Sequence, residues 1–574
     1  MKINHLKITF ISILAPLVFL YFSNYEKKLT VSTALLFFFL IFFRKYFFEN
    51  EKVFMKKIIT YNLKIFYFIL ILFFLIITQN KYLNVETITW DVSSYLVASN
   101  EIDLGNIPLE SQWESKGPLT IYIFYFLSKL TFSNYVYFKL LNDIVLFTTI
   151  IITFLVFKKL DQRFYISLLG CFILVSFFSI HWFVSEFTEF YCLPLIALAN
   201  YFSYSDKWYK YQLIGLLFGF SFLINQGSII FLIPIILMVI KQSSNIPIFF
   251  DSLKNMFFSF LIPNILFLLI YYRRGILDVY IANYIQIPLG YTGENSSSFY
   301  ELRVFLREIS YINIFTYFFI ILMLFIYLVN FLKTKNYNLN GFFNLINLNI
   351  IFSLIYYFIA GHNFYHHLVY FLYFFSFLLI KIVNESQVFL FSTIIFLSCL
   401  MTFFTTYNSA ISNLSNITKI YNNYPLKQLA QEIDSNFSGP YEVFALDYVL
   451  VLHYLDKTNY SYIVHPTNHF QKYITDELIR LNKIKENEVV YLLSKKPDVI
   501  ICNTMSIDTG GKVITTDPNN YGEEVKESDD HYCDIKNFEL EYFQLNTEKY
   551  RSDSNLNYYY DPYKEMNVFI KINK

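Results

Sequence analysis

Long apolar runs, broken by short polar segments, occupy most of the chain up to residue 406. Runs of this length with few charges cannot pack into one soluble core, and each fits a membrane-spanning helix, which needs ~20 residues. The pattern therefore predicts a polytopic α-helical membrane protein with about thirteen spans. We expect the spans at residues 8–22, 31–43, 61–78, 135–157, 165–182, 190–203, 214–226, 228–240, 255–271, 312–332, 342–360, 367–383 and 387–406.

Two apolar segments allow a second interpretation. Residues 1–23 carry Lys2 and Lys7 ahead of an apolar run, as a cleaved signal peptide would. No small-residue cleavage site follows, so an uncleaved first span is favoured. Residues 118–132 are apolar but lie inside a mostly polar loop. We interpret them as an interfacial or re-entrant segment.

Positive charge predicts the orientation, because cytoplasmic loops are enriched in Lys and Arg. Segments 44–57, 158–163 and 333–335 carry such residues and fall on the same side of the membrane as the N-terminus. We therefore predict that this side is cytoplasmic. We expect the protein in the inner or plasma membrane of the cell. The outer side then receives loop 79–134, turn 183–189, loop 272–311, turn 361–366 and everything after residue 406.

Residues 407–574 have a different pattern, in which polar residues dominate. Short β-type apolar runs at 441–446, 498–502 and 567–572 are separated by helical patterns around 470–482 and 486–495. This alternation predicts a small extracytoplasmic α/β domain. The chain is thus divided into N-terminal spans (1–60), a transmembrane core (61–406) and the soluble domain (407–574).

Composition excludes one class of function and limits the cofactors. Hydrophobic residues make up 55% of the chain and the formal net charge is +1, so the chain lacks the basic surface of a nucleic-acid binder. Cys171, Cys192 and Cys399 lie in or near apolar runs, whereas Cys502 and Cys533 could form a disulfide in an oxidising compartment. No metal-type spacing is present, and we expect neither a metal nor another cofactor, although three nearby histidines invite a metal hypothesis.

Ionisable residues cluster at the outer ends of the spans, while the middles of the spans are nearly free of charge. Such groups are costly at a membrane edge and are therefore candidates for function. The ionisable residues predicted at the outer ends of the spans are Asp91, Glu101, Asp103, Glu114, Lys116, Lys139, Asp143, His181, Glu186, Glu189, Arg273, Arg274, His362, His366 and His367.

Asp91 stands at the start of a short helix predicted by the apolar spacing of Val92, Leu96, Ser99 and Ile102, which would lie along the membrane. Gly105 is a natural end for this helix. From the spacing alone, Asp91 could be no more than the N-cap of the helix.

The same loop resembles the first outer loop of the GT-C glycosyltransferases, in particular the protein O-mannosyltransferase and aminoarabinose-transferase group. The resemblance rests on Trp90-Asp91, then Tyr95, Ala98, Ile102, Gly105 and Pro108, and on Trp113-Glu114-x-Lys116-Gly117-Pro118-Leu119 with Tyr122. Weaker likeness continues in Thr188-Glu189, in 219–227 and in 361–367. The chain departs from the family pattern at Val92, Gly117, Gln226 and His367, which puts the substrate in doubt.

The resemblance implies an inverting transfer of a hexosyl or pentosyl group from a polyprenyl-phosphate donor in the membrane to a lipid, glycan or protein acceptor at the outer face. It implies that Asp91 is the catalytic base and that Glu189 is the second acidic residue of the catalytic site. The residues that we expect to bind substrate are Tyr95, Glu114, Lys116, Tyr122, Arg273, Arg274 and His366.

Other interpretations remain for several of these residues and for the whole chain. Glu189 could be a carboxylate favoured at a helix start, with Glu186 as its local rival. Arg273 and Arg274 could be interface anchors, and His366 could cap its turn. A transporter or flippase of lipid-linked saccharides would instead carry polar residues near the membrane midplane. An inactive glycan-binding relative is a third possibility.

Overall fold

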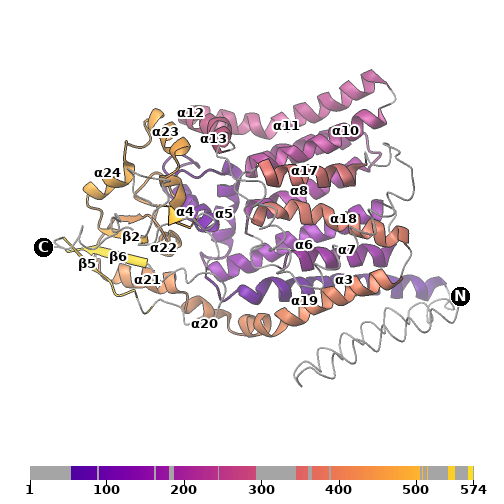
Figure 1. Cartoon of the computed structure of the whole chain (residues 1–574), viewed down its shortest axis with the longest axis horizontal. Helices are drawn as coiled ribbons and strands as arrows, with labels where there is room; N and C mark the ends of the chain where they lie inside the picture. The colour runs from indigo at the N-terminus through magenta and orange to yellow at the C-terminus, as the bar shows by residue number, and fades with distance from the viewer. Residues whose placement is uncertain are drawn as a thin grey trace.

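The computed structural model of the chain consists of a bundle of helices with a small α/β domain at one end (Figure 1). The predicted spans 8–22, 31–43 and 312–332 lie outside the described residues, as do His181, His362 and Cys533. The described residues are 53–86, 90–160, 163–179, 186–243, 245–291, 344–359, 365–386, 389–503, 507–508, 513–514, 541–547, 549 and 566–572.

The bundle confirms the helical part of the predicted fold. Three stretches are long and apolar enough to cross a membrane, namely Ile65–Tyr82, Tyr135–Lys159 and Ile246–Arg274. The number of spans stays a prediction. The bundle helices are α3 (Val53–Gln79), α6 (Tyr135–Lys159), α7 (Phe164–Phe177), α8 (Thr188–Ser203), α9 (Lys210–Ile224), α10 (Leu232–Gln242), α11 (Ile246–Arg274), α17 (Leu345–Ile359), α18 (Leu368–Ser386) and α19 (Phe389–Ser415).

Two glycines let α9 and α11 pack closely. Gly215 and Gly219 are four residues apart and therefore lie on one face of α9. A Cβ at Gly215 would lie 2.0 Å from the carbonyl oxygen of Met256, and one at Gly219 would lie 2.7 Å from that of Phe260. Small residues at this spacing allow helix backbones to approach in a membrane, where no hydrophobic effect drives helices together.

The outer loop forms a separate layer between the bundle and the domain. It contains α4 (Trp90–Ser99), the 3₁₀ helix η2 (Asn100–Leu104) and α5 (Pro118–Leu130), and it follows η1 (Asn80–Tyr82). Gly105 ends η2 with φ 81°, as the sequence predicted. However, the residues of α4 from Val92 to Ser99 are all buried. The helix is therefore not half-exposed as its apolar spacing indicated, because α22 (Leu450–Tyr454) of the C-terminal domain packs on it. Its orientation relative to the membrane stays a prediction.

The α/β domain is built on a four-stranded sheet of order β1-β2-β6-β5, in which β1 and β2 are parallel and the other pairs antiparallel. Three of these strands coincide with the three predicted β-type runs. The strands are β1 (Val443–Ala445), β2 (Val499–Asn503), β5 (Tyr542–Gln544) and β6 (Met566–Lys571), and the short pair β3 (Ile507–Asp508) and β4 (Val513–Ile514) lies apart.

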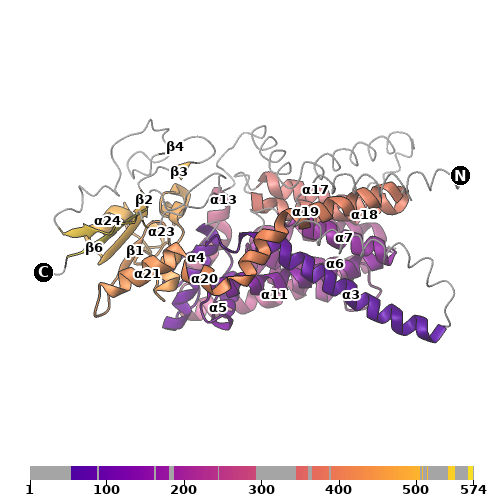
Figure 2. The same cartoon turned by 90° about the horizontal axis from the view of Figure 1, so that it is seen from below.

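Helices cover both faces of the sheet (Figure 2). Strand side chains alternate between faces, so Val499 packs towards α21 (Pro425–Ser435) and α22 (Leu450–Tyr454), while Ile500 packs towards α24 (Glu488–Ser494). The remaining short helices are α20 (Ile417–Asn422), η6 (Pro466–His469), α23 (Lys472–Arg480), η3 (Gln226–Phe231), α12 (Leu277–Ile281), the π-helix η4 (Ala282–Gln286), α13 (Ile287–Tyr291) and η5 (Tyr365–His367).

The cysteines fall into two groups. Cys171, Cys192 and Cys399 are buried free thiols in the bundle. Cys502 on β2 is buried and disulfide-bonded.

Candidate active site

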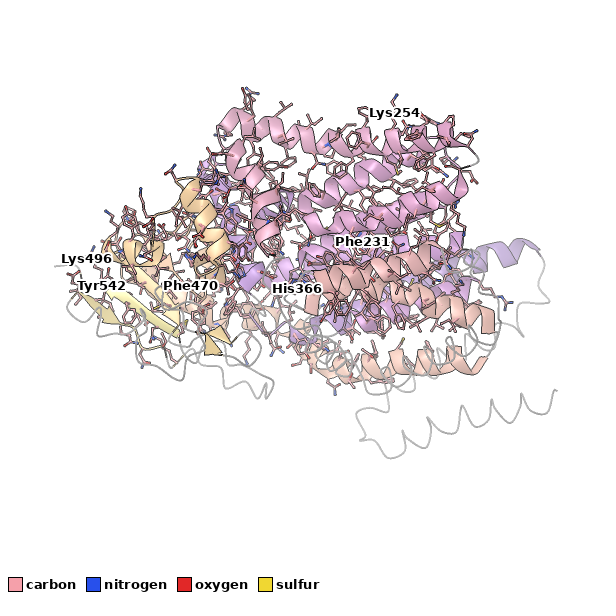
Figure 3. The ribbon with its side chains drawn as sticks, turned by 45° about the horizontal axis from the view of Figure 1, so that its top comes forward. Phe231, Lys254, His366, Phe470, Lys496 and Tyr542 are labelled. Carbon is pink, nitrogen blue, oxygen red and sulfur yellow. The ribbon has the colours of Figure 1, made fainter. Side chains whose placement is uncertain are left out.

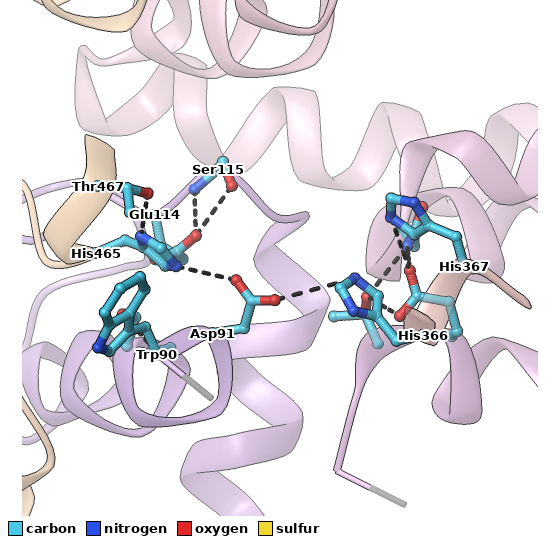
Figure 4. Close-up of polar contacts among 12 residues, drawn as sticks. Trp90, Asp91, Glu114, Ser115, His366, His367, His465 and Thr467 are labelled. Carbon is cyan, nitrogen blue, oxygen red and sulfur yellow. Dashed lines mark hydrogen bonds and ion pairs between the residues drawn. The ribbon is translucent and has the colours of Figure 1, made fainter. Parts of the chain in front are cut away.

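Polar side chains from five segments meet where the bundle joins the α/β domain. They come from α4, from the loop before α5, from the start of α8, from η5 and from η6. Figure 3 shows His366 at this junction. Figure 4 shows Asp91 between His366 on one side and His465 on the other. The structure therefore brings together two of the candidate residues singled out in the sequence, Asp91 and His366.

Asp91 is directed into this group rather than acting as a simple cap. It lies in the first turn of α4, and its Oδ1 is 3.0 Å from Nε2 of His465. Its Oδ2 is 4.0 Å from Nε2 of His366. Burial alone would raise the pKa of Asp91, but the hydrogen bond from His465 and the positive charges of His465 and Lys116 outweigh it. The pKa of this carboxyl is therefore held below its usual value, and Asp91 is ionised.

His465 is the functional candidate that sequence reasoning missed. It belongs to the C-terminal domain, 374 residues from Asp91, and it precedes η6. Its Nδ1 is 3.0 Å from Oγ1 of Thr467, and its ring meets Trp90 edge to face at 6.4 Å. No local pattern marks this histidine, because its importance depends only on which distant segment it contacts.

Glu114 and Lys116 lie beside Asp91. Glu114 is buried, and its Oε1 accepts hydrogen bonds from the backbone N–H (2.8 Å) and the hydroxyl (3.0 Å) of Ser115. Its Oε2 is buried without a hydrogen-bond partner among the described residues. Burial raises the pKa of Glu114, and His465 opposes the shift. The charge of Lys116 is close enough to act on Asp91, His366 and His465.

Glu189 lies at the start of α8, and both oxygens of its carboxylate accept hydrogen bonds. Its Oε1 accepts from Asn225 Nδ2 at 3.0 Å and from the Tyr356 hydroxyl at 3.2 Å, and it lies 3.9 Å from Nε2 of His367. Its Oε2 accepts from the Thr188 hydroxyl at 3.2 Å. The carboxylate is thus held firmly on the side of the site that η5 forms.

Its sequence rival Glu186 belongs to another cluster. Glu186 is buried and interacts electrostatically with Lys139, whose Nζ donates to the carbonyl oxygen of Val85. Asp143 accepts a 2.6 Å hydrogen bond from Asn80 near the same helix ends. The structure therefore separates the two carboxylates and places Glu189 nearer the Asp91 group.

Of the two tyrosines proposed to bind substrate, only Tyr95 joins the site. Its hydroxyl is buried and has no hydrogen-bond partner among the described residues. It interacts electrostatically with the carboxylates of Asp91, Glu114 and Glu189. Tyr122 instead meets Phe267 edge to face, and its electrostatic neighbours are Glu101, Arg274 and Glu110. Tyr122 therefore belongs to the packing of the outer loop.

The two arginines also lie away from Asp91. Arg273 is exposed. Arg274 donates to the carbonyl oxygen of Gly105 at 2.8 Å and lies 3.7 Å from Glu110. The pair lies in the last turn of α11, where Arg274 joins this helix end to the outer loop.

A cation could in principle be held by Glu189, His366 and His367, whose candidate ligand atoms all lie within 4.8 Å of one another. Two imidazoles and a carboxylate suit zinc. However, the Glu189 oxygens already accept three hydrogen bonds, and His366 Nε2 faces Asp91. The group is therefore explained by its own contacts, and the expectation that the site needs no metal stays a prediction.

Taken together, the site offers an ionised carboxylate, a neutral imidazole and a cation within one region. Burial lowers the pKa of His366 to about 4, which leaves its ring neutral near pH 7, while Asp91 opposes and Lys116 reinforces the shift. A carboxylate can accept a proton from a hydroxyl group, and Lys can stabilise a phosphate oxygen. This set of groups suits the transfer of a phosphate-linked group to a hydroxyl.

The sequence matches no protein-family model and no curated protein. The structure resembles that of ArnT from Cupriavidus metallidurans bound to undecaprenyl phosphate, with a TM-score of 0.54 and 9% identity, over 77% of this chain and 93% of that chain. The apo state of ArnT gives 0.49 at 8% identity (78% and 93%), and the Archaeoglobus fulgidus oligosaccharyltransferase in complex with Zn and sulfate gives 0.39 at 11% (76% and 68%). The chain has the GT-C glycosyltransferase fold.

Proposed function

We propose that this protein is an integral-membrane glycosyltransferase. It moves a sugar from a polyprenyl-phosphate donor to a lipid, glycan or protein acceptor at the outer face of the membrane. The observation that carries the proposal is the ionised Asp91 carboxylate, fixed between His465 and His366 beside the charge of Lys116. The undecaprenyl phosphate bound to ArnT, which has a similar fold, supports the choice of donor.

The proposed reaction is a single displacement at the anomeric carbon. The acceptor oxygen forms a bond to C1 while the bond from C1 to the phosphate oxygen breaks, and the electron pair leaves with the phosphate. Asp91 accepts the proton of the acceptor hydroxyl as general base. Attack opposite the leaving phosphate inverts the configuration at C1.

Each neighbouring group has a role that its position supports. Lys116 stabilises the charge that develops on the leaving phosphate. A hydroxyl oxygen can lie about 2.8 Å from both Asp91 Oδ2 and His366 Nε2, because these atoms are 4.0 Å apart. Tyr95 and Glu114 contribute polar atoms without other partners among the described residues, and these can bind sugar hydroxyls. Glu189 lies beside His367, on the η5 side of Asp91.

Replacing Asp91 tests this proposal directly. Asp91→Asn keeps the size of the side chain and can still accept a hydrogen bond, but it cannot take up the acceptor proton at neutral pH. Loss of a general base typically lowers the rate about 10²–10⁴-fold. The rate is measured as polyprenyl phosphate released from lipid-linked sugars extracted from the cells' own membranes, in the presence of the native acceptor.

Asp103→Asn is the matched control, since Asp103 lies in the same loop and its carboxylate pairs with the exposed Lys129 at 2.7 Å. The control should retain the wild-type rate. A purified, folded Asp91→Asn protein with a near-normal rate would end the assignment of Asp91 and leave Glu114 and Glu189 as the next carboxylates to test.

A further inference from the structure

We propose that His465 is a positioning residue of the transfer reaction, so that the C-terminal domain completes the active site of the transmembrane bundle. This inference rests on the function proposed above. Its basis is the 3.0 Å contact between His465 Nε2 and Asp91 Oδ1, which joins two segments 374 residues apart.

A short backbone junction fixes the place of His465. Trp113 and Ile463 form an isolated parallel bridge, in which Trp113 N–H donates to the Tyr462 carbonyl at 2.6 Å and Val464 N–H donates to the Trp113 carbonyl at 3.2 Å. Glu114 follows one side of this bridge and His465 follows the other. The bridge therefore places the side chains of Glu114 and His465 together beside Asp91.

Side chains reinforce this junction. The Gln112 amide donates to the carbonyl oxygens of Asn459 (3.1 Å) and Ser461 (3.0 Å), and its oxygen accepts from the Asn459 N–H at 2.7 Å. The Tyr462 hydroxyl donates to the Leu109 carbonyl at 2.7 Å. Because these contacts are buried or partly buried, the domain is held in one register against the outer loop.

The imidazole of His465 is oriented at both nitrogens. A doubly protonated ring donates from Nε2 to Asp91 and from Nδ1 to the Thr467 hydroxyl. Oδ1 of Asp91 is then occupied, and Oδ2 is the oxygen that faces His366. The histidine therefore determines which carboxylate oxygen is presented to an acceptor hydroxyl.

The charges around the pair agree with this arrangement. Burial would lower the pKa of His465, but its hydrogen bond to Asp91 and the charges of Glu114 and Asp91 raise it, against the effect of Lys116. The titratable groups that face the pair are Glu114 and Lys116 from the outer loop, Tyr95 from α4, His366 and His367 from η5, and His469 from η6. An ionised pair at this place keeps Asp91 deprotonated over a wide pH range.

The pH profile of kcat/KM for His465→Gln tests the inference. Glutamine keeps a donor near the position of Nε2 but removes the positive charge. Since an adjacent opposite charge lowers a carboxyl pKa by about one to three units, the acidic limb of the profile should move to higher pH by a similar amount. His465→Ala, which removes the donor as well, should also lower kcat on the order of 10²-fold, as a misplaced group does.

His469→Gln is the matched control, because His469 is buried in the same segment and its ring contacts Phe444 and Phe470. Burial lowers the pKa of His469 to about 3, so its removal takes no positive charge from the pair near neutral pH. Its acidic limb should stay where the wild-type limb lies. Thr467→Val is a second test that keeps the histidine. It removes the oxygen that accepts from Nδ1 and should move the limb in the same direction by less.

The outcome separates this inference from the proposed function. In the same assay, Asp91→Asn with normal activity would overturn both the role of Asp91 and the role of His465. Inactive Asp91→Asn together with a wild-type rate and pH profile for His465→Gln and Thr467→Val would overturn only the positioning role. If the inference holds, the double variant Asp91→Asn/His465→Gln is no slower than Asp91→Asn alone, because the histidine acts through the aspartate.

Discussion

Lys116 contributes a positive charge that acts on Asp91, His366 and His465, and such a charge can bind a phosphate group. We predict that Lys116→Ala weakens binding of undecaprenyl phosphate to the purified protein. A hydrogen bond to a charged group contributes about 1.5–3 kcal/mol, so the dissociation constant should rise on the order of tenfold to a hundredfold. Binding is measured by titration in detergent or nanodiscs.

Lys129→Ala provides the control for this measurement. Lys129 is an exposed lysine of the same outer loop, on α5, and it pairs with Asp103. Its loss should leave the dissociation constant unchanged. Equal effects of the two substitutions would mean that Lys116 acts only through general surface charge.

Glu189, His366 and His367 lead to a second prediction at this scale, because they lie close enough to suggest a metal ion. The carboxylate is already satisfied by Thr188, Asn225 and Tyr356. We therefore expect that chelation with EDTA, followed by dialysis, leaves the transfer rate unchanged. A loss of rate that zinc restores would show instead that these three residues hold a cation.

Among the elements, the loop between η2 and α5 depends on one buried carboxylate. Glu101 Oε1 accepts from Leu109 N–H (3.0 Å), and Oε2 accepts from the N–H groups of Ser111 (2.8 Å) and Gln112 (3.1 Å). We predict that Glu101→Gln destabilises the protein, because an amide has only one acceptor oxygen and turns its NH₂ group towards a buried donor. The cost of such a mismatch is about 1–3 kcal/mol.

Thermal unfolding in detergent measures this effect, with Asp103→Asn as the comparison. Asp103 lies in the same 3₁₀ helix, but its ion pair with Lys129 is solvent-exposed, and such pairs contribute about 0–1 kcal/mol. The Tm of Glu101→Gln should fall clearly below that of Asp103→Asn. Equal values would show that the loop does not depend on the buried carboxylate.

Periodicity predicted the elements well because it reflects burial. Short apolar runs of β-type residues marked β1, β2 and β6, and Gly105 marked the end of η2. Periodicity could not show that α4 is covered on nearly all sides, because its cover is α22, a helix far away in the chain. A pattern within one helix reports how much of it is apolar but not which partner covers it.

The sequence predicted only those site residues that lie in segments resembling the GT-C family. Asp91, Glu114, Lys116 and Glu189 were found through the family resemblance and do surround one region. Arg274 was found through its charge, yet it binds the carbonyl oxygen of Gly105. His465 was missed because the contact that matters joins two separate domains.

For the whole molecule, the decisive feature is that α4, which carries Asp91, lies at the end of the bundle that meets the α/β domain (Figure 1). The opposite end carries positive charge: Lys158 and Lys159 end α6, and Lys241 ends α10. Lys159 also lies over the ring of Tyr201 near the end of α8, at 5.6 Å. A membrane-inserted bundle with this asymmetry should have the charged end in the cytoplasm.

This asymmetry predicts the topology. A reporter fused after Lys159 should be cytoplasmic, because this residue ends α6 at the positively charged end of the bundle. A reporter fused after Tyr424 should lie outside, because the hydroxyl of Tyr424 donates to the Leu83 carbonyl beside the outer loop and the α/β domain begins there. Paired fusions to alkaline phosphatase and green fluorescent protein distinguish the two sides, since each is active on one side only. If both positions reported the same side, Asp91 could not meet an acceptor at the outer face in the way proposed.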